Sequence, residues 1–184
     1  MTEKIKKNLV VCLYGGPGSG KSTTAASLFV QLKIQGYDVE LAREYVKDWV
    51  WEGREIKPGD QSYLCAKQAR RERILFKDNQ IIVTDSPLWL YSIYERQYEP
   101  SPMVSHAIIQ KQLKVAEQSN FSYTHIFLKR ISQYNPKGRF QTEEEAKRID
   151  EEIISMLRLE QLSYEEITVN EKAVENILNH LYSI

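Results

Sequence analysis

The chain has 184 residues, of which 42% are hydrophobic and 27% charged, a composition typical of one folded domain and not of a disordered chain. Lys plus Arg (25) balance Asp plus Glu (25), so there is no general attraction to nucleic acid or anionic membrane beyond local patches. The apolar run 9–14 is too short for a signal-peptide core or a membrane span. We therefore expect a cytoplasmic protein with a single domain over residues 1–184, in which Cys12 and Cys65 are reduced packing residues.

Apolar runs alternate with helical patterns along the whole chain, which favours an α/β fold with a mostly parallel sheet. The predicted strands, in chain order, are residues 8–14, 37–42, 80–84, 124–128 and 166–169. The predicted helical segments are residues 21–35, a region through 46–51, then 61–77, 88–98, 104–118, a helix that follows a capping box at Thr142, and 172–182.

A glycine-rich turn lies between the first predicted strand and the first helix and satisfies the pattern G-x-x-x-x-G-K-[ST] in full. Such a turn aims backbone N–H groups at phosphate, Lys21 is expected to bridge β- and γ-phosphate oxygens, and Ser22 is expected to bind Mg²⁺. The alternative is that this glycine-rich turn matches the pattern by chance and binds no phosphate. Its position directly between a predicted strand and a predicted helix disfavours that alternative. The residues expected to bind the phosphates of ATP are Gly15, Gly16, Pro17, Gly18, Ser19, Gly20, Lys21, Ser22 and Thr23.

Asp85 ends the third predicted strand, at the edge of the sheet where the glycine-rich turn is also expected. A carboxylate there can hold Mg²⁺ or accept a proton from a substrate hydroxyl. The alternative is an ordinary strand-end Asp that caps the following helix. The chain has no guanine-reading N-K-x-D or T-K-x-D element and is short for a motor ATPase, so both classes are disfavoured.

Four further stretches carry a resemblance, namely Arg43–Val46, Ala69–Glu72, Thr84–Pro87 and Tyr134–Arg139. With the glycine-rich turn, they resemble the P-loop nucleoside and nucleotide kinases. The chain is most similar to the nicotinamide-riboside-kinase domain of NAD-salvage proteins and to phage-type kinases often called AAA-like ATPases, and less so to thymidylate kinase, which usually has Arg where Ser86 stands. The resemblance implies a three-layer P-loop NTPase fold with a five-stranded sheet, a short basic lid at 129–142 and a homodimer in many relatives.

The resemblance also implies roles for residues on the acceptor side. Glu44 matches the acidic residue that orients or deprotonates the acceptor hydroxyl, and Arg43 can bind its phosphate or ribose. Arg70 and Arg71 match the region where an arginine meets the acceptor phosphate. Consecutive helical residues point about 100° apart, so only one of these two is expected to face the cleft. The alternatives are a surface Arg-Glu pair and solvated arginines.

The predicted lid concentrates positive charge, with Gly138 as its hinge. Cations there would surround the transferred charge, and closure would exclude water. Arg139 is our first candidate for the catalytic arginine, and Arg130 is the second and a nucleotide-binding candidate. A solvated basic loop is the alternative. We interpret Arg148 as structural, paired with Glu144 or Glu152.

Aromatic residues flank Glu44 and Asp85 in the sequence. They can stack on a base or nicotinamide ring, but we interpret most of them as core residues. The three histidines lack metal-site spacing, so no zinc site is assigned. The aromatic residues are Trp49, Trp51, Trp89, Tyr91 and Tyr94.

These observations predict an ATP- and Mg²⁺-dependent phosphotransferase for a small nucleoside, nucleotide or nucleotide-like acceptor, without a membrane partner. Two alternatives stay open. One is a kinase of a hydroxyl on DNA, RNA or a modified base, which has the same chemistry. The other is an ATP-dependent switch or regulator that acts on a protein partner.

Overall fold

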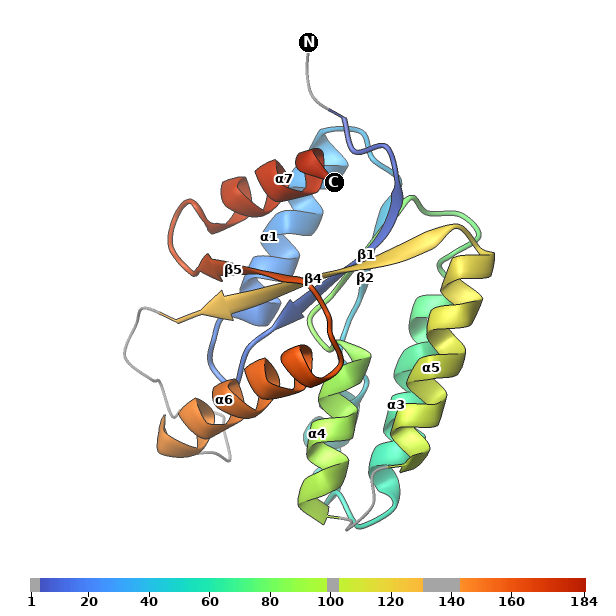
Figure 1. Cartoon of the computed structure of the whole chain (residues 1–184), viewed down its shortest axis with the longest axis vertical. Coiled ribbons are helices and arrows are strands. Elements are labelled where there is room, and N and C mark those ends of the chain that lie inside the picture. The colour runs from blue at the N-terminus through green and yellow to red at the C-terminus, as the bar shows by residue number, and fades with distance from the viewer. Residues whose placement is uncertain (1–3, 99–102, 131–142) are drawn as a thin grey trace.

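The computed structural model describes residues 4–98, 103–130 and 143–184. Five parallel strands form one sheet in the order β2-β3-β1-β4-β5 (Figure 1). The predicted mostly parallel, five-stranded sheet is thus confirmed. The strands are β1 (Asn8–Tyr14), β2 (Val39–Ala42), β3 (Ile81–Thr84), β4 (Phe121–Lys129) and β5 (Tyr164–Thr168).

Helices cover both faces of the sheet, which gives the predicted three layers. α1 and α7 lie on one face, and α3, α4, α5 and α6 lie on the other (Figure 1). The short α2 precedes α3. The helices are α1 (Lys21–Ile34), α2 (Val46–Trp51), α3 (Asp60–Arg73), α4 (Leu88–Tyr98), α5 (Met103–Gln118), α6 (Glu143–Leu159) and α7 (Ala173–Ser183).

The central strand β1 shows why its sequence is apolar without alternation. Its even-numbered residues from Val10 to Tyr14 pack in the cluster under α3–α6, and its odd-numbered residues from Leu9 to Leu13 pack under α1 and α7. Both faces of a parallel sheet are covered by helices, so every position of a central strand is buried. Cys12 and Cys65 are buried and free, as predicted.

Several boundaries differ from the predicted ones for local reasons. β4 begins at Phe121 instead of residue 124, because its first residues pair with the start of β1 at Asn8. β2 begins at Val39 instead of residue 37, because the Tyr37 N–H bonds to Leu32 and so completes the end of α1. α3 ends at Arg73, after which Phe76 bonds only three residues back.

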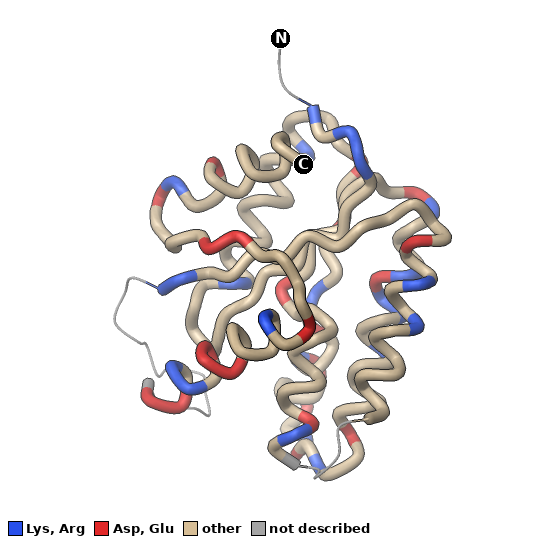
Figure 2. Tube along the Cα trace, in the orientation of Figure 1, with Lys and Arg blue, Asp and Glu red and all other residues tan. Residues whose placement is uncertain are grey.

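The strand order places β1 between β3 and β4, so the chain leaves β1 towards one side and later returns to the other. Ligands of open α/β sheets bind beyond the carboxyl ends of the strands at such a point. Lys and Arg residues alternate with Asp and Glu residues along much of the trace (Figure 2). Across the described residues, no helix has both the length and the apolar character that a bilayer crossing requires.

Candidate active site

The glycine-rich turn joins the end of β1 to the first residue of α1 and passes beneath α6. Gly20 precedes α1 with φ +89°, a left-handed backbone that side chains disfavour. Its carbonyl accepts the Thr24 N–H, which begins the helix. The unpaired N–H groups of the first helical turn therefore face the turn, which is the arrangement that binds phosphate.

Lys21 lies across this turn. Its Nζ donates to the carbonyl oxygen of Gly15 at 2.6 Å and to that of Gly16 at 3.1 Å. Burial lowers the pKa of the Lys21 ammonium, and the nearby carboxylates of Glu44, Asp85 and Asp150 oppose this shift. The ammonium is thus held at the phosphate-binding turn by carbonyl groups that a nucleotide phosphate can replace.

The carboxyl end of β3 brings Asp85 against α1 and the segment after β2. Ser22 donates from Oγ to Asp85 Oδ2 at 2.6 Å, and the Glu44 N–H donates to Asp85 Oδ1 at 3.2 Å. Asp85 is 5% exposed, so both oxygens are directed to these partners and not to bulk water. The structure therefore brings together Lys21, Ser22, Glu44 and Asp85.

Glu44 lies where the chain enters α2 and is half-buried. Burial raises the pKa of its carboxyl, as does the Asp85 charge, while Lys21 and Lys47 act in the opposite direction. A carboxylate with a raised pKa is a better proton acceptor near neutral pH than a solvated one. Its surroundings suit Glu44 for taking a proton from a hydroxyl.

Ser22 and Asp85 also fit a magnesium ion. Both present hard oxygen atoms to one point, and Mg²⁺ is usually held by one or two carboxylates, waters and substrate phosphates. Ser22 Oγ and Asp85 Oδ2 would hold the ion beside the phosphate-binding turn. Mg²⁺ bound there would neutralise charge on the nucleotide phosphates.

On its other side the turn contacts α6. The Gly16 N–H donates to Asp150 Oδ1 at 2.5 Å, and Arg130 donates from Nη2 to Asp150 Oδ2 at 2.7 Å. A Cβ at Gly16 would lie 2.6 Å from the Ala146 carbonyl oxygen, so only glycine permits this approach. The Nε and Nη1 atoms of Arg130 are buried and have no hydrogen-bond partner among the described residues.

The acceptor-side arginines are arranged differently from one another. Arg71 donates to Asp48 at 2.9 Å and to the Arg43 carbonyl at 3.2 Å, and it lies over the Tyr45 ring. The side chains of Arg70 and Arg43 are exposed. Arg71 is therefore the member of the pair that faces α2.

The predicted lid is described only at its start. Arg139 and the rest of 131–142 lie outside the described residues. Lys129 pairs with Glu166 and Arg130 with Asp150, so both described cations have carboxylate partners. Arg148 pairs with Glu152 at 3.6 Å, as its structural interpretation predicted.

Most of the flanking aromatic residues are core residues, as predicted. Trp49 is 7% exposed, and Trp89 and Tyr91 are each 3% exposed. Trp51 is the exception at 87% exposed. The Trp49 ring contacts Tyr63 and lies under Arg54, whose guanidinium carbon is 4.3 Å from the ring centroid.

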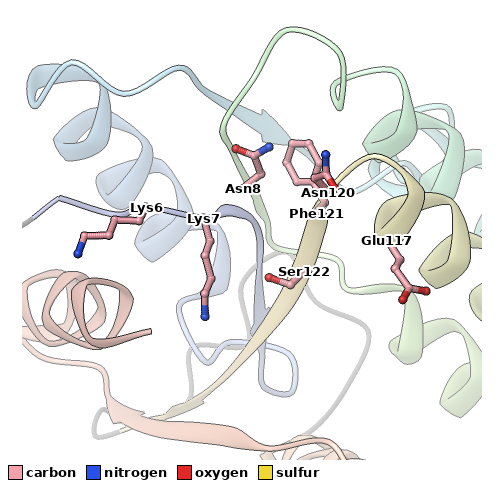
Figure 3. A pocket seen from close by; sticks show the side chains of 7 residues that line it. All are labelled: Lys6, Lys7, Asn8, Glu117, Asn120, Phe121 and Ser122. Carbon is pink, nitrogen blue, oxygen red and sulfur yellow. The ribbon is translucent and has the colours of Figure 1, made fainter.

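The hollows at the surface of the described residues include the following two. One, of about 590 Å³, runs between α1 and α7 and is lined by Thr23, Thr24 and Val169, and a Cβ at Gly20 would lie 3.2 Å from Val169. The other, of about 400 Å³, lies at the opposite ends of β1 and β4 around Lys7 and Ser122 (Figure 3). The length of β1, about 20 Å, separates this second hollow from the phosphate-binding turn.

Two residues of the site were not predicted from the sequence, Lys47 and Asp150. Lys47 donates from Nζ to Ser22 Oγ at 2.9 Å and lies 3.7 Å from Asp85 Oδ2. No local sequence pattern distinguishes it from the other charged residues near α2. Asp150 lies four residues after Ala146 on the buried stripe of α6, and a carboxylate on an apolar stripe is a signal for a buried partner.

The sheet order, the glycine-rich turn and the Lys21–Ser22–Asp85 cluster define a P-loop NTPase, a class built for nucleotide-dependent phosphoryl chemistry. The chain belongs to the AAA domain family, whose sequence pattern matches residues 10–176. No curated protein matches the chain.

Two solved structures show the same fold. The NadR protein in complex with NR has a TM-score of 0.70 and 16% identity, and the match covers 98% of this chain and 52% of that one. Thymidylate kinase from Ehrlichia chaffeensis has a TM-score of 0.59 and 11% identity, with 95% and 98% of the two chains covered. The three-layer P-loop architecture predicted from the sequence is therefore confirmed.

Proposed function

We propose that the protein transfers the γ-phosphoryl group of ATP to a hydroxyl of a small nucleoside, nucleotide or nucleotide-like acceptor. The observation that carries this proposal is the position of Glu44. Its carboxyl is half-buried and close enough to Lys21 and Asp85 for their charges to shift its pKa, on the side of the turn where α2 begins. A half-buried base at this place can activate a water or an organic hydroxyl, and the neighbouring ring pair of Tyr45 and Tyr63 favours an organic acceptor.

Each residue has a role in this reaction. The N–H groups of the turn and the Lys21 ammonium bind the phosphates and stabilise the charge that spreads over the transferred group. Glu44 accepts the proton of the acceptor hydroxyl. The hydroxyl oxygen bonds to the γ-phosphorus, and the bond between that phosphorus and the bridging oxygen breaks, so that ADP leaves. Asp85 fixes Ser22 and the Glu44 backbone, so the base and the phosphates keep their relative position.

Two features support the choice of acceptor. The NadR structure contains NR, so riboside compounds are the first acceptors to test here. Tyr45 follows Glu44 in the chain, and its ring contacts the ring of Tyr63, which is 46% exposed. Flat aromatic bases stack on such surfaces.

The hollow between α1 and α7 borders the phosphate-binding turn, and we propose that it holds the base of ATP.

The first experiment is a transfer screen with γ-labelled ATP. Nucleosides, nucleoside monophosphates, nicotinamide riboside and oligonucleotides are offered separately, and labelled product is separated from labelled phosphate. We expect label on a small acceptor. Label on oligonucleotides alone would establish the polymer kinase instead, and release of phosphate that no acceptor changes but a protein partner increases would establish the regulator.

Glu44→Gln tests the base with the acceptor so found. The substitution is nearly isosteric and removes the proton-accepting charge, so we expect kcat to fall by about 10²–10⁴-fold while ADP affinity changes little. The control is Glu55→Gln, an exposed glutamate of the same segment, for which kcat is expected to stay unchanged. An unchanged kcat in Glu44→Gln would show that Glu44 is not the base and would favour the alternative of a surface Arg-Glu pair.

A further inference from the structure

The Lys47 side chain reaches from α2 to the two atoms that fit a magnesium ion. Its Nζ is 2.9 Å from Ser22 Oγ and 3.7 Å from Asp85 Oδ2. Ser22 donates its single hydroxyl proton to Asp85, so its oxygen lone pair accepts from Lys47. One ammonium thus completes a hydroxyl–carboxylate pair that would otherwise carry an unbalanced negative charge at a site where Asp85 is almost fully buried.

A metal ion and this ammonium require the same oxygen atoms. Mg²⁺ contacts its ligands at about 2.0–2.1 Å and demands near-octahedral geometry, which leaves no room for a cation hydrogen-bonded to the same hydroxyl oxygen. Two positive charges that share ligand atoms also repel one another strongly in a partly buried site. Occupation by one therefore excludes the other.

The Lys47 side chain is able to leave. It is 47% exposed, so the four-carbon stem can turn into water without opening the core. Lysine carries a compact charge on a flexible stem, unlike the planar and often stacked arginine. Arg54 and Arg71, by contrast, lie over aromatic rings and are held there.

We propose that Lys47 is an exchange residue, whose ammonium occupies the magnesium position of the metal-free site and leaves it when Mg²⁺ is bound. This inference rests on one part of the proposed function, namely that the site binds a nucleotide together with Mg²⁺. Lys47 keeps Asp85 neutralised in the absence of metal, so the nucleotide phosphates are not repelled, and it raises the magnesium concentration at which the metal-loaded complex forms.

The proposal predicts two effects of opposite sign in one variant. In Lys47→Met, magnesium no longer competes with an ammonium, so the Mg²⁺ concentration that half-saturates its effect on ADP binding is expected to fall by about tenfold. With the metal chelated, Asp85 is no longer neutralised, so ADP is expected to bind about tenfold more weakly than to the wild type. A variant whose site is merely destabilised would bind ADP more weakly in chelator and would also need more Mg²⁺ for half-saturation.

The experiment is isothermal titration with ADP at a series of MgCl₂ concentrations and in excess chelator, at constant ionic strength. Lys47→Arg keeps the charge, so ADP binding in excess chelator is expected to stay within about threefold of the wild type. Lys57→Met is the matched control, an exposed lysine beyond the end of α2, and both of its values are expected to equal those of the wild type.

An unchanged or increased half-saturating magnesium concentration in Lys47→Met would overturn the proposal. So would equal shifts in Lys57→Met, because the effect would then be one of net charge. The readout contains no phosphoryl acceptor, so a transfer screen that finds no acceptor would refute the proposed function and leave this result standing. Conversely, an unchanged magnesium response in Lys47→Met would refute the exchange role of Lys47 and would leave the proposed phosphorylation of an acceptor standing.

Discussion

The contact between α6 and the phosphate-binding turn should contribute measurably to stability, and Asp150→Ala tests it. The substitution removes the acceptor of the Gly16 N–H and the charged partner of Arg130 at once. The side chains of Arg130 and Asp150 are only 13% and 20% exposed, so the guanidinium would be left largely buried without its carboxylate.

The expected magnitude follows from that burial. Breaking a buried ion pair by removing one partner costs about 3–5 kcal/mol, and the remaining access to water reduces this to about 2–3 kcal/mol here. For a domain of this size the midpoint of thermal unfolding is then expected to fall by about 4–12 °C. Urea unfolding followed by circular dichroism, without nucleotide, measures the free energy directly.

Three companion variants separate the contributions. Asp150→Asn keeps an oxygen for the Gly16 N–H and is expected to cost less than Asp150→Ala. The double variant Arg130→Met with Asp150→Leu removes both charges and is also expected to cost less, because no uncompensated charge remains. Glu151→Ala, at an exposed neighbouring position, is the control. A loss below about 0.5 kcal/mol in Asp150→Ala would refute the reasoning.

Three further predictions concern the site, the lid and the core. Lys21→Ala is expected to abolish phosphoryl transfer with an unchanged circular dichroism spectrum, and residual transfer above about a tenth of wild type would contradict the assignment of this lysine. Arg139→Ala is expected to lower kcat strongly, by up to about 10³–10⁵-fold, with a small change in KM for ATP, and a near-normal kcat would remove this arginine from the reaction. Burial raises the pKa of Glu72 from 4.5 to about 8, so the unfolded chain releases this proton more readily than the native one and stability falls as pH rises between these values. Glu72→Gln is expected to remove that fall in the free energy of unfolding, which amounts to about 3 kcal/mol at about pH 7. Urea unfolding between about pH 5 and about pH 8 tests this, and a variant whose stability falls with pH as steeply as that of the wild type would contradict it.

The parts of the site that the sequence predicted are those fixed by strand ends. Lys21 and Ser22 follow β1 and Asp85 follows β3, and parallel neighbouring strands must end at the same edge of the sheet. Glu44 follows β2, the next strand along, so its approach to Asp85 results from the same rule. Lys21 and Ser22 were predicted from the glycine-rich motif and Asp85 from its strand end, whereas the role of Glu44 came from the resemblance to nucleoside and nucleotide kinases.

Lys47 and Asp150 could not be predicted in this way, because their roles depend on how helices are placed. Lys47 is one of many charged residues between β2 and β3, and only the angle of the short α2 directs it to Ser22. Asp150 is one of several acidic residues in α6, and only the packing of Ala146 on Gly16 brings it to the turn. Helix placement is set by the whole core, which no local pattern reports.

The uneven exposure of the three tryptophans gives the protein an optical reporter of its own. Trp49 and Trp89 emit from the core, whereas Trp51 projects into water from the end of the helix that also carries Lys47. Emission from Trp51 is therefore open to quenching by iodide or acrylamide, and the other two provide an internal reference. Trp51→Phe removes the quenchable component without touching the core, so any shielding that an acceptor or a nucleotide confers on α2 can be followed in real time without a label.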